Sequence, residues 1–288
     1  MISVKEATPE MFPQVFELLR QFNVNNPAIT REDWQSLFNY RWKSPDDPLG
    51  FVLAGDGKIV GYLGAICSRR VIAGRQEKFC NITSWVTDKN HRQQAIMLLT
   101  PILKLADYTI TNQSPAKHIH PLFTKLGFQE LERKRVILFP FPEFKRLVTP
   151  SGFRCTTGKN LIAKILKEPD ATIFKDHLPF QCGHLLIYND ETYAYALFTK
   201  TKGRKYHFSH VHYISNKPVF FANLNKVRFH LLKTNRALFT MIDSRFVGNA
   251  KCLHSRLVEW ASATLYKSAT LKPGQIDNLY SELILLHL

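Results

Sequence analysis

The chain has 288 residues and a composition typical of globular proteins, so it can hold one large domain or two of ordinary size. Its net charge of +16 is spread along the sequence and attracts polyanions, but no helix-turn-helix, zinc-finger or ribonucleoprotein motif accompanies it. A generally basic surface therefore explains this charge at least as well as a nucleic-acid partner does. No apolar run reaches the length of a membrane span.

The five cysteines are scattered, with no Cys-x-x-Cys pair and no histidine at metal-ligand spacing. We therefore expect reduced thiols, a cytoplasmic location and no bound metal. Residues 1–5 are typical of the start of a strand rather than of a signal peptide.

The first part of the chain predicts a strand, two helices and then three antiparallel strands. Thr8 and Pro9 form a helix start, with Thr8 as N-cap and Pro9 in the first position. Asp56-Gly57 is typical of a hairpin turn. We expect strands at 3–7, 51–54, 59–68 and 76–86, and helices at 10–22 and 30–40.

The stretch 81–128 organises the first half of the sequence. A strand ends at Trp85 and Val86, a polar turn covers 87–94, and then a helix at 95–105, a strand at 108–111 and a helix at 116–126 are expected. A turn from a strand into a helix is an anion site, because the free N–H groups and the helix dipole both favour a phosphate. Arg92 adds a positive charge to that turn, and Gly127 suits the left-handed residue that ends a helix.

Two segments of this stretch resemble motifs of the GNAT superfamily of N-acyltransferases. Residues 92–97 read Arg-Gln-Gln-Ala-Ile-Met, where the family has Arg/Gln-x-x-Gly-x-Gly/Ala, and neither this register nor the one beginning at His91 has the glycines. Residues 121–128 read Pro-Leu-Phe-Thr-Lys-Leu-Gly-Phe, close to the family's Leu-Tyr-x-Lys-Leu-Gly-Phe. Phe123 stands where the family usually has tyrosine. The resemblance covers residues 1–139.

The resemblance implies an α/β (α+β) fold with a mixed, mostly antiparallel GNAT-type sheet flanked by helices. It also implies acetyl-CoA or another acyl-CoA as co-substrate, held where the fourth strand enters the turn, with polar residues after the fifth strand meeting the cofactor's arm. The alternative role of those polar residues is helix capping, and the missing glycines leave weak or lost CoA binding open. The cofactor-binding residues implied are Trp85, Val86, Arg92, Gln93, Gln94, Ala95, Ile96, Asn112, Ser114 and Phe123.

Acyl transfer to an amine needs a neutral amine, a polarised carbonyl and a protonated leaving thiolate. In the family a tyrosine often gives the last proton, which Phe123 cannot do. His120 shares a helix face with Phe123 and is either a catalytic group or a surface histidine. Asp88 is either a base or a turn residue that bonds its own backbone. Ser84 and Trp85 point to opposite faces of their strand, so one of them faces the acceptor. The catalytic candidates are thus His120, Asp88 and Ser84.

The second half repeats this order of elements after a connector at 140–152, the predicted boundary between domains 1–145 and 146–288. The repeated order predicts a second, diverged GNAT-like half, although no Leu-Gly-Phe helix follows Asp243. A basic turn covers 202–205. We expect strands at 184–189, 192–200, 206–214, 237–243 and 263–267, and helices at 161–166, 174–180, 218–233 and 275–286.

Polar residues of the second half form no recognisable catalytic triad. His210 and His212 face the same side of a strand, but no nearby cysteine or aspartate completes a metal-binding set. Further polar groups near a predicted strand end are Asp243, Arg245, His254, Arg256 and Glu259.

From these observations we predict a cytoplasmic N-acyltransferase that transfers an acetyl or larger acyl group from acyl-CoA to a small-molecule amine, for example an amino sugar. The alternative is a catalytically inactive module of the same fold that binds CoA, a nucleotide or a protein partner. A role linked to nucleic acid is a third hypothesis.

Overall fold

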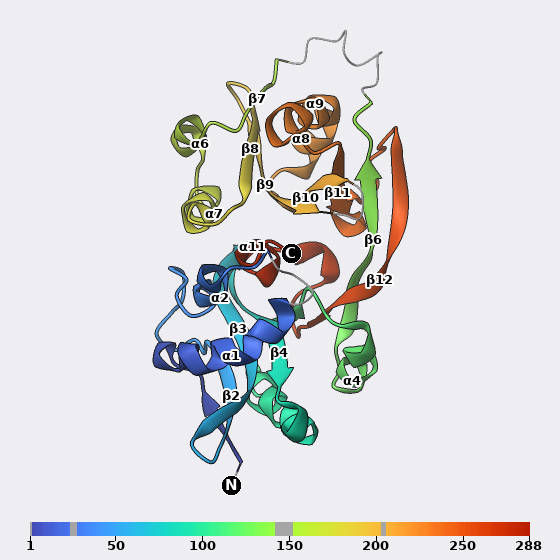
Figure 1. Ribbon diagram of the computed structural model, residues 1–288. Coiled ribbons are helices and arrows are strands. Elements are labelled where there is room, and N and C mark those ends of the chain that lie inside the picture. The colour runs from blue at the N-terminus through green and yellow to red at the C-terminus, as the bar shows by residue number, and fades with distance from the viewer. Residues whose placement is uncertain (1, 24–27, 142–151, 203–205) are drawn as a thin grey trace. The chain divides into compact units, whose positions relative to one another are not determined.

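The computed structural model describes residues 2–23, 28–141, 152–202 and 206–288 (Figure 1). Contacts group the chain into two units. Unit 1 comprises Met1–Gln129, Thr264–Lys272 and Tyr280–Leu286, and unit 2 comprises Glu130–Ala263, Pro273–Leu279 and His287–Leu288. Most of the predicted connector, and residues 203–205 of the predicted basic turn, lie outside the described residues. The C-terminal part of the chain contributes to both units, which a linear division of the sequence does not anticipate.

Unit 1 contains an antiparallel meander followed by a parallel crossover. Its strands pair in the order β1-β2-β3-β4-β5, with β4 and β5 parallel, and the end of β12 pairs antiparallel with β5. The predicted hairpin turn is confirmed, since Asp56 and Gly57 both have positive φ. The strands are β1 (Ser3–Glu6), β2 (Gly50–Gly55), β3 (Lys58–Ile72), β4 (Arg75–Thr87), β5 (Tyr108–Asn112) and the last residues of β12 (Ser255–Lys267).

Helices cover both faces of this sheet. On one face α1 packs against β3 and β4, and Phe38 stacks on Tyr62 with ring centroids 5.5 Å apart. On the other face Leu63 packs in a core cluster with Leu98 and Phe123, because neighbouring residues of a strand point to opposite faces. The helices are η1 (Pro9–Met11), α1 (Phe12–Asn23), α2 (Arg31–Ser36), η2 (Lys89–Leu98), α3 (Leu99–Leu103), η3 (Lys117–Ile119) and α4 (His120–Lys125).

The local signals for helix starts and ends in unit 1 were informative. Thr30 and Asp33 form a reciprocal capping box at the start of α2, although this helix ends at Ser36 and not near residue 40. Gly127 has φ of 84°, and the Phe128 N–H donates to the Phe123 carbonyl at 3.0 Å. This is a Schellman motif, so the predicted left-handed cap of α4 is confirmed.

The α-helix predicted at 95–105 is present only at Leu99–Leu103, so its predicted start is wrong. Residues up to Leu98 form the 3-10 helix η2, and the α-helix α3 begins only at Leu99. Pro101 has no N–H group, so it is compatible with the first turn of a helix but not with its interior. It therefore places a helix start near residue 99, inside the predicted helix.

Unit 2 repeats the plan of unit 1. The meander β7-β8-β9-β10 is followed by a parallel pairing of β10 with β11, and β6 pairs antiparallel with β11. Its helices are α6 (Lys159–Ile165), α7 (Asp170–His177), α8 (Lys217–Ala222), α9 (Leu224–Asn235), α10 (Ser244–Val247) and η4 (Pro273–Gln275). Its strands are β6 (Gln129–Leu138), β7 (Arg154–Thr156), β8 (Gly183–Tyr188), β9 (Tyr193–Lys202), β10 (His207–Ile214), β11 (Phe239–Asp243) and the earlier residues of β12.

Two predicted helices of the second half are divided or shortened in the structure, and the helix expected at 174–180 lies at Asp170–His177. Asn223 divides the helix expected at 218–233 into α8 and α9, because its side chain donates to the Val219 carbonyl at 2.9 Å and ends α8. The helix expected at 275–286 is reduced to α11 (Glu282–Leu285), since the Asp277 carboxylate accepts from the Leu279 N–H and favours a turn.

Each unit takes its last strand from the other half of the sequence. β6 follows the elements of unit 1 along the chain but pairs with β11 in unit 2, whereas β12 ends beside β5 in unit 1. The predicted fold class, a mixed and mostly antiparallel sheet flanked by helices, is confirmed.

Candidate functional site

The centre of unit 1 is the point where β4 and β5 part. Their parallel pairing runs from Lys78 with Tyr108 to Asn81 with Thr111, and in the described part of the chain β4 then continues beside β3 alone. A β-bulge interrupts the register with β3 just beyond this point, and Ser84 has φ of 53°. Strained non-glycine residues of this kind gather at functional sites.

The bulge changes the directions of the side chains at the end of β4. The hydroxyl oxygens of Thr83 and Ser84 lie 3.0 Å apart, so these neighbours do not alternate as in a regular strand. Trp85 packs edge-on against Phe123 with centroids 6.1 Å apart, and its indole N–H is buried with no hydrogen-bond partner among the described residues. Val86 is buried. Trp85 therefore faces α4.

Asp88 caps the 3-10 helix that follows β4. Its carboxylate accepts a hydrogen bond from the Asn90 N–H at 2.9 Å, and its carbonyl accepts one from the His91 N–H at 3.0 Å. These contacts are those of a turn residue that bonds its own backbone. His91 lies 3.6 Å from the same carboxylate.

The predicted phosphate turn is folded into η2. Gln93, Gln94, Ala95 and Ile96 lie inside this helix, and the 3-10 pattern directs backbone N–H groups to carbonyls three residues earlier. The predicted contact of these four amides with a phosphate therefore requires η2 to open. Arg92 is exposed and keeps its charge available to a phosphate.

Phe123 and His120 lie together on α4. Phe123 has no exposed surface and packs edge-on against Phe128 with centroids 4.8 Å apart. His120 is the first residue of α4, half-buried, and its Nε2 has no hydrogen-bond partner in the part of the chain that the structure describes. Phe123 thus serves the core in this conformation, whereas His120 retains a ring nitrogen for chemistry.

A buried carboxyl group from the C-terminal segment reaches the parting of the two strands. Glu282 accepts hydrogen bonds from the Asn81 amide and, at 2.5 Å, from the Ser114 hydroxyl, and Thr111 bonds Asn81 in turn at 3.1 Å. Ser114 is therefore close to Glu282, while Asn112 is buried at the end of β5, opposite Leu265 of β12.

Glu282 has an unusual proton affinity. Complete burial raises the pKa of its carboxyl group, and the hydrogen bonds from Ser114 and Asn81 partly oppose this change. The sequence analysis missed this residue, because it lies 168 positions from Ser114. Its signal in the sequence was an acidic residue directly before the apolar run 283–286. A carboxyl group that is buried together with such a run needs hydrogen-bond partners.

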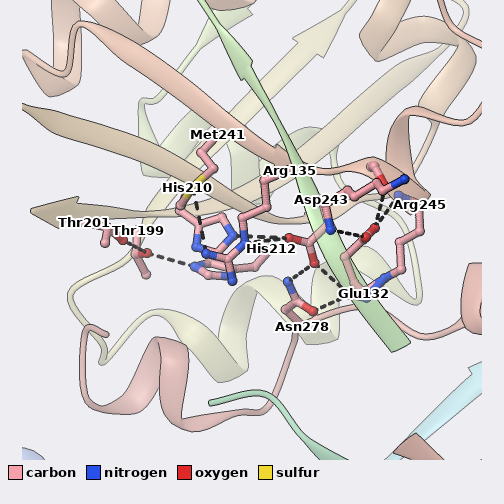
Figure 2. A network of polar contacts seen from close by, with 12 residues as sticks. Glu132, Arg135, Thr199, Thr201, His210, His212, Met241, Asp243, Arg245 and Asn278 are labelled. Atoms are coloured by element: carbon pink, nitrogen blue, oxygen red, sulfur yellow. Dashed lines mark hydrogen bonds and ion pairs between the residues drawn. The ribbon is translucent and has the colours of Figure 1, made fainter. Parts of the chain in front are cut away.

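Unit 2 has a charged network at the corresponding place, where β10 and β11 are parallel (Figure 2). Asp243, at the end of β11, lies 3.0 Å from Arg245 and 3.4 Å from Arg135, and accepts a hydrogen bond from Asn278 at 2.9 Å. His210 lies 3.6 Å from the same carboxylate. The predicted strand-end groups Asp243 and Arg245 are thus brought together, and the residues that sequence reasoning missed are Glu132, Arg135 and Asn278.

The charges of this network are fixed by burial and by each other. Burial would raise the pKa of Asp243, but Arg245, His210 and Arg135 lower it well below its usual value. Burial also lowers the pKa of His210 and His212, although the Asp243 carboxylate partly opposes this change. The ring centroids of His210 and His212 lie 4.3 Å apart. Among the described residues, no group of three or more His, Cys, Asp or Glu side chains is arranged to hold a metal ion.

Other predicted residues of unit 2 lie outside this network. Arg256 and Glu259 are exposed on β12, and His254 packs edge-on against Phe141. In unit 1, a hollow of about 370 Å³ is lined by Lys5, Met97 and Lys104 among others, and none of the residues predicted to bind a cofactor lines it.

The comparisons with known proteins identify a fold. No family model and no curated protein matches the sequence. The structure is similar to a GCN5-related N-acetyltransferase from Anabaena variabilis (TM-score 0.58, 12% identity, 93% of this chain and 72% of that one). It is also similar to a probable N-acyltransferase from Enterococcus faecalis (TM-score 0.59, 12% identity, 93% and 72%).

A third similar structure contains the GCN5-related glucosamine N-acetyltransferase region of a fungal multi-domain β-N-acetylglucosaminidase (TM-score 0.58, 10% identity). The match covers 92% of this chain and 38% of that one. No helix in the described ranges is long and apolar enough to cross a membrane, and no disulfide joins the five cysteines there. The chain has the fold of the GCN5-related N-acetyltransferases, as its two sequence motifs implied.

Proposed function

We propose that the protein is an acyl-CoA-dependent N-acyltransferase whose active site lies in unit 1, where β4 and β5 part. The observation that carries this proposal is the combination, within unit 1, of the parting strands, the bulge at Ser84 and the exposed Arg92 of the helix that follows β4. A backbone N–H of β4 beside the bulge would polarise the thioester carbonyl, as the resemblance to the family implies.

We expect the phosphates of acyl-CoA to be bound by charged side chains more than by backbone amides. The amides of η2 are engaged within the helix, whereas Arg92 is exposed at its surface. Side-chain contacts with phosphate are charge-assisted and weaken with salt. We therefore expect CoA affinity in this protein to depend strongly on Arg92 and on ionic strength.

The acceptor is proposed to be a small amine, with amino sugars as the first class to test. One structure of the same fold is described as a glucosamine N-acetyltransferase region, and the net charge of +16 would favour an acceptor that carries phosphate groups. Acetyl-CoA is the first donor to test. The cytoplasmic location and the tandem origin of the two units remain predictions.

The proposal is tested by calorimetric titration with acetyl-CoA and by an assay of thiol release with a panel of amines. Arg92→Ala should weaken acetyl-CoA binding about tenfold, or about 1.4 kcal/mol, because it removes a charge-assisted contact. Arg75→Ala is the matched control, since Arg75 is exposed at the opposite end of β4. Equal affinities of the two variants and the wild type would contradict the placement of the cofactor.

A second candidate function is a binding module without turnover. Two observations favour it: the engaged amides of η2 and the full burial of Phe123 at the position of the family's tyrosine. Acetyl-CoA binding without thiol release, across amines that include amino sugars, would support this function over the enzyme.

A further inference from the structure

The C-terminal segment brings a carboxyl group to the parting of β4 and β5. Glu282 is the first residue of α11, and its side chain is completely buried. Asn81 is the last residue of β4 that pairs with β5, and it donates to Oε2 of Glu282. Ser114, just beyond β5, donates to Oε1. The carboxyl group is thus held by one donor from β4 and one donor from the residues that follow β5.

The geometry of these contacts suits a proton acceptor. Both carboxyl oxygens accept a hydrogen bond, and an ionised carboxylate is the form that only accepts. Each oxygen has further lone pairs, so the two contacts fix the orientation of the group without using its full capacity. After burial, the largest influences on the pKa of Glu282 are neutral donors: the side chains of Ser114 and Asn81 and the backbone N–H groups of Glu282 and Ser114.

We propose that Glu282 accepts the proton of the attacking amine during acyl transfer, an inference that rests on the function proposed above. An alkylammonium substrate first gives one proton to a carboxylate oxygen of Glu282, and the neutral nitrogen then forms a bond with the thioester carbon and loses a second N–H proton to solvent. The C–S bond then breaks, and its electron pair leaves with the sulfur as a thiolate. Solvent supplies a proton to the thiolate, and Glu282 returns its proton to solvent, so the net products are an amide, a free thiol and a proton.

The raised proton affinity of Glu282 supports this role. A general base is most effective when its pKa approaches the working pH, and burial moves the pKa of this carboxyl group upward from that of an exposed glutamate. A purely structural role would be to anchor the C-terminal segment to unit 1 through Asn81 and Ser114. The two roles differ in how the rate depends on the nucleophile.

The test compares two nucleophiles in the full-length protein. Glu282→Gln keeps the size of the side chain and a carbonyl acceptor but removes the base. Thiol release from acetyl-CoA with an alkylamine, which is protonated at neutral pH, should fall about a hundredfold in this variant. Release with hydroxylamine, which is neutral at that pH and more easily attacks unaided, should fall much less. Glu17→Gln, at an exposed acid of α1, is the matched control and should change neither rate.

A second variant covers a failure of Glu282→Gln to fold. Ser114→Ala removes a donor that lowers the pKa of Glu282, so that pKa should rise. Because Glu282 acts as the ionised form, the acid limb of the pH–rate profile should move to higher pH. Tyr280 lies on the same segment as Glu282, and the guanidinium of Arg70 lies over the ring of Tyr280. Arg70 should stay charged over this pH range, so it should not contribute to the acid limb.

The outcomes separate this inference from the function on which it rests. Equal losses with alkylamine and hydroxylamine in folded Glu282→Gln, or an unshifted acid limb in Ser114→Ala, would overturn the role of Glu282 and leave the enzyme intact. No thiol release by the wild type with either nucleophile would refute the proposed function, and with it this inference.

Discussion

Asp243 and Glu282 are buried carboxyl groups whose pKa values move in opposite directions. Asp243 lies between two arginines, which hold its pKa below the usual value in spite of burial. The main hydrogen-bond partners of Glu282 are neutral donors. The effect of burial therefore dominates, and the pKa of Glu282 rises. The charge of the neighbours, more than the degree of burial, decides in which direction the pKa of each carboxyl group moves.

Asp243 should make the stability of the protein fall in acid. A depressed pKa in the folded state gives a stabilisation that is fully present above the unfolded value, about 3.9, and is lost as the pH falls through the folded value. At neutral pH Asp243→Asn leaves Arg135 and Arg245 without their carboxylate, which should cost about 3–5 kcal/mol in the free energy of unfolding.

Urea unfolding at a series of pH values measures this effect. The difference between the wild type and Asp243→Asn should shrink as the pH is lowered from about 5 towards 2. Asp190→Asn is the control, because Asp190 is exposed and pairs with Arg154 at 3.0 Å on the surface; its cost should stay below about 1 kcal/mol. A small and pH-independent cost for Asp243→Asn would show that the network does not hold this charge.

At the scale of the element, α4 shows how far local sequence determines structure. Its end was predictable because Gly127 is the residue type that a left-handed cap needs, and the hydrogen bonds of that cap are present. The start of α3 was also encoded, by Pro101, but the apolar pattern across 95–105 outweighed this signal in the prediction.

Replacing the cap glycine should weaken unit 1 without disturbing its packing. A Cβ at Gly127 would meet Lys267 Nζ at 3.7 Å, an ordinary contact, so the cost of Gly127→Ala is that of a left-handed alanine. We expect a loss of about 1 kcal/mol in the free energy of unfolding. Gly274→Ala is the control, because its Cβ would point into open space and its φ is not positive. A neutral Gly127→Ala would mean that the cap is not maintained in solution.

Contacts between distant segments explain most of what the sequence could not predict. The strand expected at 263–267 begins at Ser255. Its earlier residues were not predicted, because several of them are exposed and show no apolar alternation. Glu282, Arg135 and Asn278 act through partners that no local motif reveals. By contrast, the antiparallel orders β2-β3-β4 and β8-β9-β10 follow from hairpin turns and period-two patterns and were predicted, whereas the short strand β7 was not.

At the scale of the whole molecule, the C-terminal residues belong to both units. Asn278 bonds the His212 carbonyl and Asp243 in unit 2, and Glu282 bonds Asn81 and Ser114 in unit 1. A chain that ends at Lys272 should therefore show faster amide hydrogen exchange in both β4 and β10, since each loses a partner. A chain shortened only by residues 287–288 is the control. Unchanged exchange in one of the two strands would show that this unit does not need the segment.

The exchange of β6 and β12 between the units has a consequence for synthesis on the ribosome. While the chain emerges, β5 exposes the edge that β12 will later cover, and it does so until residue 267 has left the exit tunnel. An open strand edge is a template for pairing with another nascent chain. The polysome is therefore the place where this protein is most exposed to aggregation, and slow translation of the second half would prolong that exposure.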